Sequence, residues 1–160
     1  MGTRIWYEVS MTSAFEEIRF VRMYYNATNK TAVAYVSNAN NELPENLKTR
    51  VEEFLRNQGS AHLLHKVKPY SEIEADQVSF LADPPLEIKR LALLGSLNQS
   101  GIKKSLSLAF PFLDMELTNF ENGVLKIWIS NQDSLSQMEC QIIRDYSNEI
   151  VPLGVTVEFI

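Results

Sequence analysis

The 160-residue chain contains a single cysteine, Cys140, and only two histidines. One cysteine cannot form an internal disulfide or build a multi-cysteine zinc site, so the sequence predicts a protein of a reducing compartment. Positive charge is also scarce, because 15 lysines and arginines stand against 20 aspartates and glutamates, for a net charge of −5. An acidic chain is poorly suited to a polyanion, and nucleic acid is not expected as its main partner.

Long hydrophobic runs are missing as well. The longest apolar stretches, residues 91–95 and 108–113, are far shorter than the roughly 20 residues that a membrane helix needs. The first ten residues turn polar within a few positions, whereas a signal peptide carries an apolar core of about seven residues or more. The sequence therefore predicts a protein without a membrane partner, located in the cytoplasm.

Signatures of catalysis and of cofactor binding are absent. The chain has no Gly-x-Gly-x-x-Gly loop and no Gly-Lys-Ser/Thr motif, so no nucleotide site is predicted. His62 and His65 lack a third ligand nearby, which predicts no metal site. Cys140 lies on a predicted helix as an apolar filler, and the alternating acids of residues 72–76 are expected to be solvated. We expect no catalytic residue and no cofactor, although a cysteine and a histidine distant in sequence leave an enzyme as an open alternative.

The first third of the chain reads mostly as strands. Residues 3–10 alternate between apolar and polar side chains, which predicts a half-buried strand. Residues 17–26 and 31–37 also alternate and are joined by an asparagine-rich link, which predicts a β-hairpin.

A helix is predicted next, from Pro44 to Gly59, because proline suits a first helical turn and glycine suits a left-handed C-cap. The stretch 61–81 shows mixed alternation and is expected to hold one or two strands, with Pro69 kept away from any central position. Asp83-Pro-Pro85 then predicts an internal boundary, since two prolines favour an extended connector.

Beyond Pro85 the pattern becomes helical. Leu86, Leu91 and Leu94 predict the apolar stripe of a helix that ends at Gly95. Ser100 is expected to cap a further stretch of helix that Pro111 stops, so the segment is either a helix pair or one broken helix.

The most distinct local signal is Asn122-Gly123, a hairpin turn between residues 115–120 and 124–130. In the second of these strands the odd-numbered residues are apolar, whereas the even-numbered ones include Lys126 and Trp128.

The last predicted helix begins with a capping box of Ser134 and Gln137. Its apolar stripe comprises Leu135, Met138, Ile142 and Tyr146. A turn at Pro152 then leads to a final strand, residues 155–160.

These patterns together predict an α+β fold. Residues 1–83 are expected to form a strand-rich subdomain, a mixed or antiparallel sheet with one helix, and residues 86–160 an α-β-β-α-β subdomain. No repeat period is visible in the sequence.

Aromatic side chains on strands are the remaining functional signal, since Trp and Tyr are favoured anchors at protein interfaces. Alternation places some of them outward, and the terminal α-β-β-α-β unit is expected to carry most of the contacts. The predicted interface residues are Trp128, Lys126, Trp6, Tyr25 and Phe159.

Residues 98–160 resemble the closing segment of contractile-phage tail and baseplate proteins. The similar elements are a Ser-Gly helix start ahead of residues 102–110, a strand pair, a helix, and the ending Ile-Val-Pro-Leu-Gly-Val-Thr-Val at 150–157. Residues 32–80 look like part of the baseplate J-like wedge family, although no Ala-Pro-Gly precedes the strand AVAYVS.

The resemblance implies a structural virion component of the tail, without cofactor or catalysis. Its partners would be other tail or baseplate proteins, or further copies of the chain, assembled in the host cytoplasm. The first alternative is a small α+β interaction or regulatory domain, and the second is an enzyme whose site joins residues distant in sequence.

Overall fold

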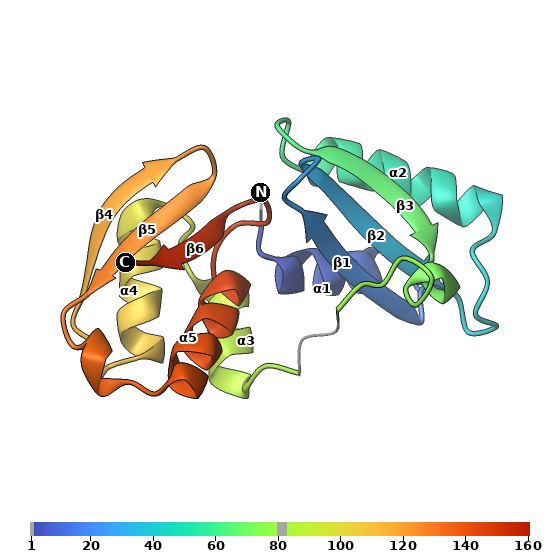
Figure 1. Ribbon diagram of the computed structural model, residues 1–160. Coiled ribbons are helices and arrows are strands. Elements are labelled where there is room, and N and C mark those ends of the chain that lie inside the picture. The colour runs from blue at the N-terminus through green and yellow to red at the C-terminus, as the bar shows by residue number, and fades with distance from the viewer. Residues whose placement is uncertain (1, 80–82) are drawn as a thin grey trace. The chain divides into compact units, whose positions relative to one another are not determined.

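The computed structural model describes residues 2–79 and 83–160 and divides into two compact units, residues 1–80 and 81–160 (Figure 1). Each unit combines helices with a three-stranded mixed sheet. The predicted α+β class is confirmed.

The first unit follows the order α-β-β-α-β. Its elements are α1 (Arg4–Ala14), β1 (Phe20–Asn26), β2 (Thr31–Ser37), α2 (Glu45–Gln58), β3 (Leu64–Pro69) and a 3₁₀ turn, Tyr70–Glu72. Strand β2 lies in the centre, antiparallel to β1 and parallel to β3. The predicted hairpin is confirmed, and Pro69 ends an edge strand, where its missing N–H costs no ladder bond.

The predicted strand over residues 3–10 is wrong, because this segment is helix α1. The Thr3 hydroxyl caps the helix by accepting a 3.1 Å hydrogen bond from the backbone N–H of Trp6. Tyr7 and Met11 are fully buried, and because they are four residues apart they lie on the same face of the helix. A short window of alternating residues is compatible with the two-residue period of a strand and with the 3.6-residue period of a helix. The N-cap and the burial of this face favour the helix. The first unit therefore has two helices, not one.

Helix α2 begins after Pro44 and ends at Gly59 as predicted, but Gly59 is not left-handed, since its φ is −75°. Glycine is required there by space, because a Cβ would collide with the carbonyl oxygen of Leu55 and the ring of His65. Of the stretch 61–81, only β3 is a strand. Residues 80 and 81 of that stretch lie outside the described residues.

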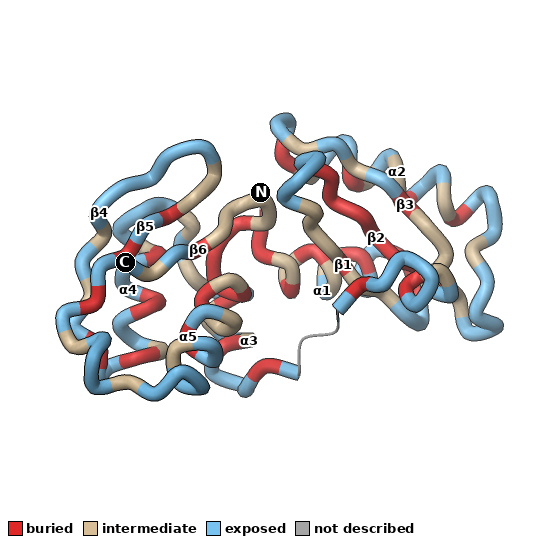
Figure 2. Tube along the Cα trace, viewed as in Figure 1, coloured by how far each residue is buried: buried red, intermediate tan, exposed pale blue. Residues whose placement is uncertain are grey.

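Both faces of β2 are buried along its whole length (Figure 2). In Figure 1 both helices lie behind this sheet, where α1 packs against β1 and α2 against β3. On the other face Val33 and Tyr35 pack against Ile73 and Val78, which follow β3. The segment after β3 thus closes the second face of the sheet.

The second unit has the order α-α-β-β-α-β, because the predicted first helix is a pair. Its elements are α3 (Leu86–Leu94), α4 (Gln99–Ala109), β4 (Met115–Glu121), β5 (Val124–Ile129), a 3₁₀ turn (Gln132–Ser134), α5 (Gln137–Glu149) and β6 (Thr156–Phe159). Strand β5 is central, antiparallel to β4 and parallel to β6. Asn122 and Gly123 have φ values of 54° and 79°, which confirms the predicted hairpin turn.

Two predicted helix caps of this unit are displaced by two residues. Asn98, not Ser100, caps α4 by accepting a 2.7 Å hydrogen bond from the N–H of Gly101. The capping box of α5 joins Ser136 and Glu139 rather than Ser134 and Gln137. Several side chains could serve as caps, and where each helix packs decides which one does.

The predicted apolar stripes of α3 and α5 are also wrong. Ile88 and Ala92 are the buried residues of α3, whereas Leu86 and Leu94 are exposed. On α5 the buried face includes Ile143 and Ser147, and its predicted stripe residues Met138 and Ile142 are exposed.

The two units repeat one topology, since α4-β4-β5-α5-β6 follows the same order and strand directions as α1-β1-β2-α2-β3. Phe15 and Phe110 end the equivalent helices α1 and α4, and both are buried. The turn that follows is closed by the same hydrogen bond in both units. The backbone N–H of Ile18 donates to the carbonyl oxygen of Phe15, and that of Leu113 to the carbonyl oxygen of Phe110, each at 3.1 Å. What repeats is the pattern of burial and turns rather than residue identity, so the sequence shows no period.

Candidate functional site

Three predicted interface residues lie in the second unit. Trp128 and Lys126 point to the exposed face of β5, and Trp128 keeps 46% of its surface accessible. Phe159 is half-buried on β6 and lines a small cavity beside Cys140 and Ile143 of α5. Phe159 therefore lies on the helix side of the sheet, opposite to Trp128.

The other two lie in the first unit. Trp6 belongs to helix α1, not to a strand. Its ring meets that of Tyr7 edge-on, with the ring centroids 5.1 Å apart. Its ring also covers Gly2 so closely that a Cβ there would collide with it. Tyr25 is half-buried on β1. The five predicted residues are thus divided between the two units.

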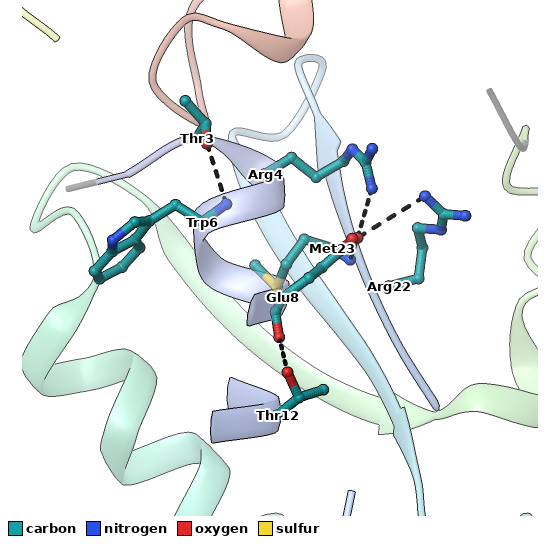
Figure 3. Close-up of polar contacts among 7 residues, drawn as sticks. All are labelled: Thr3, Arg4, Trp6, Glu8, Thr12, Arg22 and Met23. Atoms are coloured by element: carbon teal, nitrogen blue, oxygen red, sulfur yellow. Dashed lines mark hydrogen bonds and ion pairs between the residues drawn. The ribbon is translucent and has the colours of Figure 1, made fainter. Parts of the chain in front are cut away.

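The carboxylate of Glu8 is the centre of the polar cluster in Figure 3. It accepts hydrogen bonds from Arg4 at 2.7 Å and from the backbone N–H of Met23 at 2.8 Å, and Arg22 lies 4.0 Å away. Burial raises the pKa of the Glu8 carboxyl above its ordinary value, although Arg4, Met23 and Arg22 oppose this shift. These contacts fasten α1 to β1, so we assign this cluster to the fold.

A second polar cluster lies where residues 70–78 cover the first sheet. Asp76 accepts hydrogen bonds from Lys68 at 2.6 Å and from the Tyr35 hydroxyl at 2.7 Å. The bond from Lys68, and then that from Tyr35, lowers the pKa of the Asp76 carboxyl. Burial and the bond to Asp76 raise the pKa of the Tyr35 hydroxyl. An aspartate with a lowered pKa and a tyrosine with a raised pKa are both unsuited to proton transfer near neutral pH. We therefore assign a structural role to this cluster as well.

The histidines form no candidate metal site. His65 lies with its Nε2 atom 3.3 Å from the carbonyl oxygen of Ser60, on the helix side of β3. Across residues 2–79 and 83–160, no three His, Cys, Asp or Glu side chains gather as metal ligands do.

The second unit carries an apolar groove with a cavity of about 1070 Å³. Its walls come from α3, α4, α5 and the turn after α4, which Figure 1 shows on the left. Four large apolar side chains line this groove and remain exposed: Leu94 (77%), Leu108 (61%), Phe112 (61%) and Ile142 (40%). Below we call these residues and this hollow the helical groove.

Charged side chains of both signs also line the helical groove. Glu87 and Arg90 come from α3, and Lys104 comes from α4. Glu139 of α5 lines it too, but its carboxylate caps its own helix, and those hydrogen bonds with Ser136 lower its pKa. The groove thus offers an apolar surface with a few ionic groups, which is the usual make-up of a binding site.

Sequence reasoning missed the helical groove, because apolar stripes were assigned to the core. One signal was present: Leu106 and Leu108 are two positions apart on one helix and cannot both face the same core. The structure buries Leu106 and exposes Leu108. Phe110 and Phe112 behave in the same way around Pro111, the first buried and the second exposed, with their rings 6.3 Å apart.

Comparisons with known proteins assign no family to the chain. No family model and no curated protein matches the chain. In the described part of the chain, no helix is long and apolar enough to cross a membrane.

Proposed function

We propose that the chain is a protein-binding subunit whose helical groove holds an amphipathic helix of a partner protein. The observation that carries the proposal is the contiguous exposure of Leu94, Leu108 and Phe112 around a cavity of about 1070 Å³. Isolated exposed leucines are common on proteins, but contiguous apolar patches mark sites of interaction.

The shape and charge of the groove favour a helix as its occupant. Helix α4, which forms one wall, has 11 residues and is about 16 Å long, enough to lie along roughly three turns of a partner helix. Apolar side chains at helical spacing would fill the cavity, as in other helix-in-groove complexes. Arg90 and Lys104 on the walls, together with Glu87, favour a partner helix that carries charges of both signs on its flanks.

A direct test uses a fluorescent peptide of about 16 residues, with leucines at helical spacing and lysine and glutamate elsewhere. We expect the full chain to bind it with a rise in anisotropy, and Leu108→Glu to weaken binding by about tenfold or more. Leu108 is exposed, so this change should leave the melting temperature nearly unaltered.

Leu86→Glu is the matched control, because Leu86 is 79% exposed on α3 but does not line the groove. Equal loss of binding in both variants, or no binding by the unmodified chain, would contradict the proposal. Binding of a peptide with the same composition but scrambled leucine spacing would argue against a helical occupant.

The role in a contractile tail is a more specific hypothesis, which rests on the resemblance of residues 98–160. It predicts a ring-shaped or larger assembly with other tail proteins or with further copies of the chain. A small interaction or regulatory domain would instead remain a monomer with a partner in its groove. Sedimentation of the purified chain, with and without proteins encoded beside it, separates these two alternatives.

A further inference from the structure

The second sheet has an exposed face, which lies opposite to its apolar face of Leu125, Ile127 and Ile129. Trp128 lies on this face near the end of the central strand β5, and the exposed charged residues that the register places on the same face are Lys126, Glu116 and Glu121 of β4, and Glu158 of β6. We call these five residues the outer sheet face. We propose that it binds an arginine-bearing segment of a partner protein, independently of the helical groove.

The first unit shows how this face of the fold is closed. Tyr35 and Trp128 are each the fifth residue of the equivalent strands β2 and β5. Tyr35 is only 2% exposed, because Ile73 and Val78 pack on it and Asp76 accepts its hydroxyl hydrogen. An aromatic side chain at this position is thus covered by a short segment that brings apolar atoms and one charged partner. Trp128 is 46% exposed and is open to a segment of comparable size.

The strand register determines which charge that segment should carry. Glu116 is the direct partner of Trp128 in the antiparallel pair, and directly opposite side chains lie about 5 Å apart at their Cβ atoms. Lys126, the direct neighbour of Glu158 in the parallel pair, is the single cation of this face, against the three carboxylates of Glu116, Glu121 and Glu158. This excess of negative charge favours a cation, and the Glu116 carboxylate is the acid directly opposite the indole.

Arginine fits these two groups better than lysine does. Its planar guanidinium stacks on the face of an indole ring and can give two parallel hydrogen bonds to one carboxylate. Lysine has a compact, strongly hydrated ammonium that cannot do both at once. The outer sheet face therefore favours arginine over lysine and over its neutral analogue citrulline.

The test follows the indole N–H signals of the full chain by NMR. The two tryptophans give two signals, which Trp6→Phe assigns. The probe is the blocked tripeptide Ala-Arg-Ala, compared with its lysine and citrulline counterparts. We expect a saturable shift of the Trp128 signal with the arginine peptide, at concentrations up to about 10 mM, and a much smaller one with citrulline.

Glu116→Gln should weaken binding of the arginine peptide by about fivefold or more. Glu121→Gln is the matched control, because Glu121 is an exposed acid at the far end of the same strand. Equal shifts with arginine and citrulline, no Trp128 shift, or equal weakening by both variants would overturn the proposal. A Trp128 shift that depends on protein concentration without peptide would instead assign this face to a second copy of the chain, and would also overturn it.

Discussion

The hydroxyl group of Tyr35 donates a 2.7 Å hydrogen bond to the carboxylate of Asp76, 41 residues further along the chain. This bond joins the central strand of the first sheet to the segment that covers it. Lys68 of the neighbouring strand donates to the same carboxylate oxygen at 2.6 Å. The closure of the first sheet is therefore polar as well as apolar, and each part can be tested separately.

Tyr35→Phe should lower the free energy of unfolding by about 1 kcal/mol, because it removes the hydrogen bond and leaves the packing of the ring in place. Chemical denaturation followed by circular dichroism measures this change. Tyr25→Phe is the control, since Tyr25 is half-buried on β1, an edge strand of the same sheet. A loss equal to that of the control would mean that the bond to Asp76 adds nothing to stability.

The pH dependence of stability should reveal Asp76. Its pKa is lowered in the folded chain by Lys68 and Tyr35, so the unfolded chain takes up the proton first as the pH falls. The stabilisation is present above the ordinary aspartate pKa of about 3.9 and is lost as the pH falls through the folded value. The melting temperatures of the original chain and of Asp76→Asn should therefore differ at pH 7 and converge in acid. A constant difference from pH 7 to pH 2 would contradict this.

The contribution of Glu8 to the pH dependence of stability should have the opposite sign to that of Asp76. Burial raises the pKa of Glu8, so the folded chain takes up the proton first as the pH falls below neutral. The stability linked to this proton is fully present below the ordinary glutamate pKa of about 4.3 and is lost as the pH rises through the folded value. Glu8→Gln, which is neutral at every pH, should remove this dependence. Melting temperatures of both proteins at several pH values between about 4 and 8 test it, and parallel curves would contradict it.

Gly123→Val should destabilise the second hairpin by about 1 kcal/mol or more, because Gly123 has a φ of 79° that a β-branched residue avoids. A Cβ there would also lie 3.1 Å from the carbonyl oxygen of Gly154. Gly123→Asn is the matched variant, since asparagine tolerates positive φ and meets the same neighbour. A loss of stability that is equal in the two variants would attribute the effect to crowding rather than to backbone conformation.

The predicted subdomains call for a fragment experiment. Each unit has its own sheet and its own buried side chains, such as Val51 and Leu55 in the first and Leu106 and Ile127 in the second. We expect residues 1–80 and residues 81–160, expressed separately, each to unfold cooperatively on heating. Fragments that show no cooperative transition would mean that neither unit is stable without the other.

Local signals alone predicted several elements correctly. The Asn-Gly turn and the alternation of β5 depend on residues close together in the chain, whereas the glycines after α2 and α3 were predicted correctly as helix ends although neither is left-handed. Such preferences act in any tertiary setting, which is why the sequence determined both hairpins and the α+β class.

Tertiary packing decided the rest. Residues 3–10 could pair as a strand or wind as a helix, and burial of Tyr7 and Met11 on one helical face selected the helix. The leucines of α3 and α4 could have filled the core, but each helix has only one buried face, so Leu94 and Leu108 were left to line a groove.

The clearest case is the pair of equivalent aromatic residues, Tyr35 and Trp128. Strand geometry, in which successive side chains point to opposite faces, determined that each points away from its neighbours on the strand. Whether that direction leads into a core or into solvent depends on a segment that returns over the sheet, as residues 70–78 do for Tyr35. A contact made across some 40 residues of chain leaves no trace in the local pattern, so only the folded structure distinguishes the covered residue from the open one.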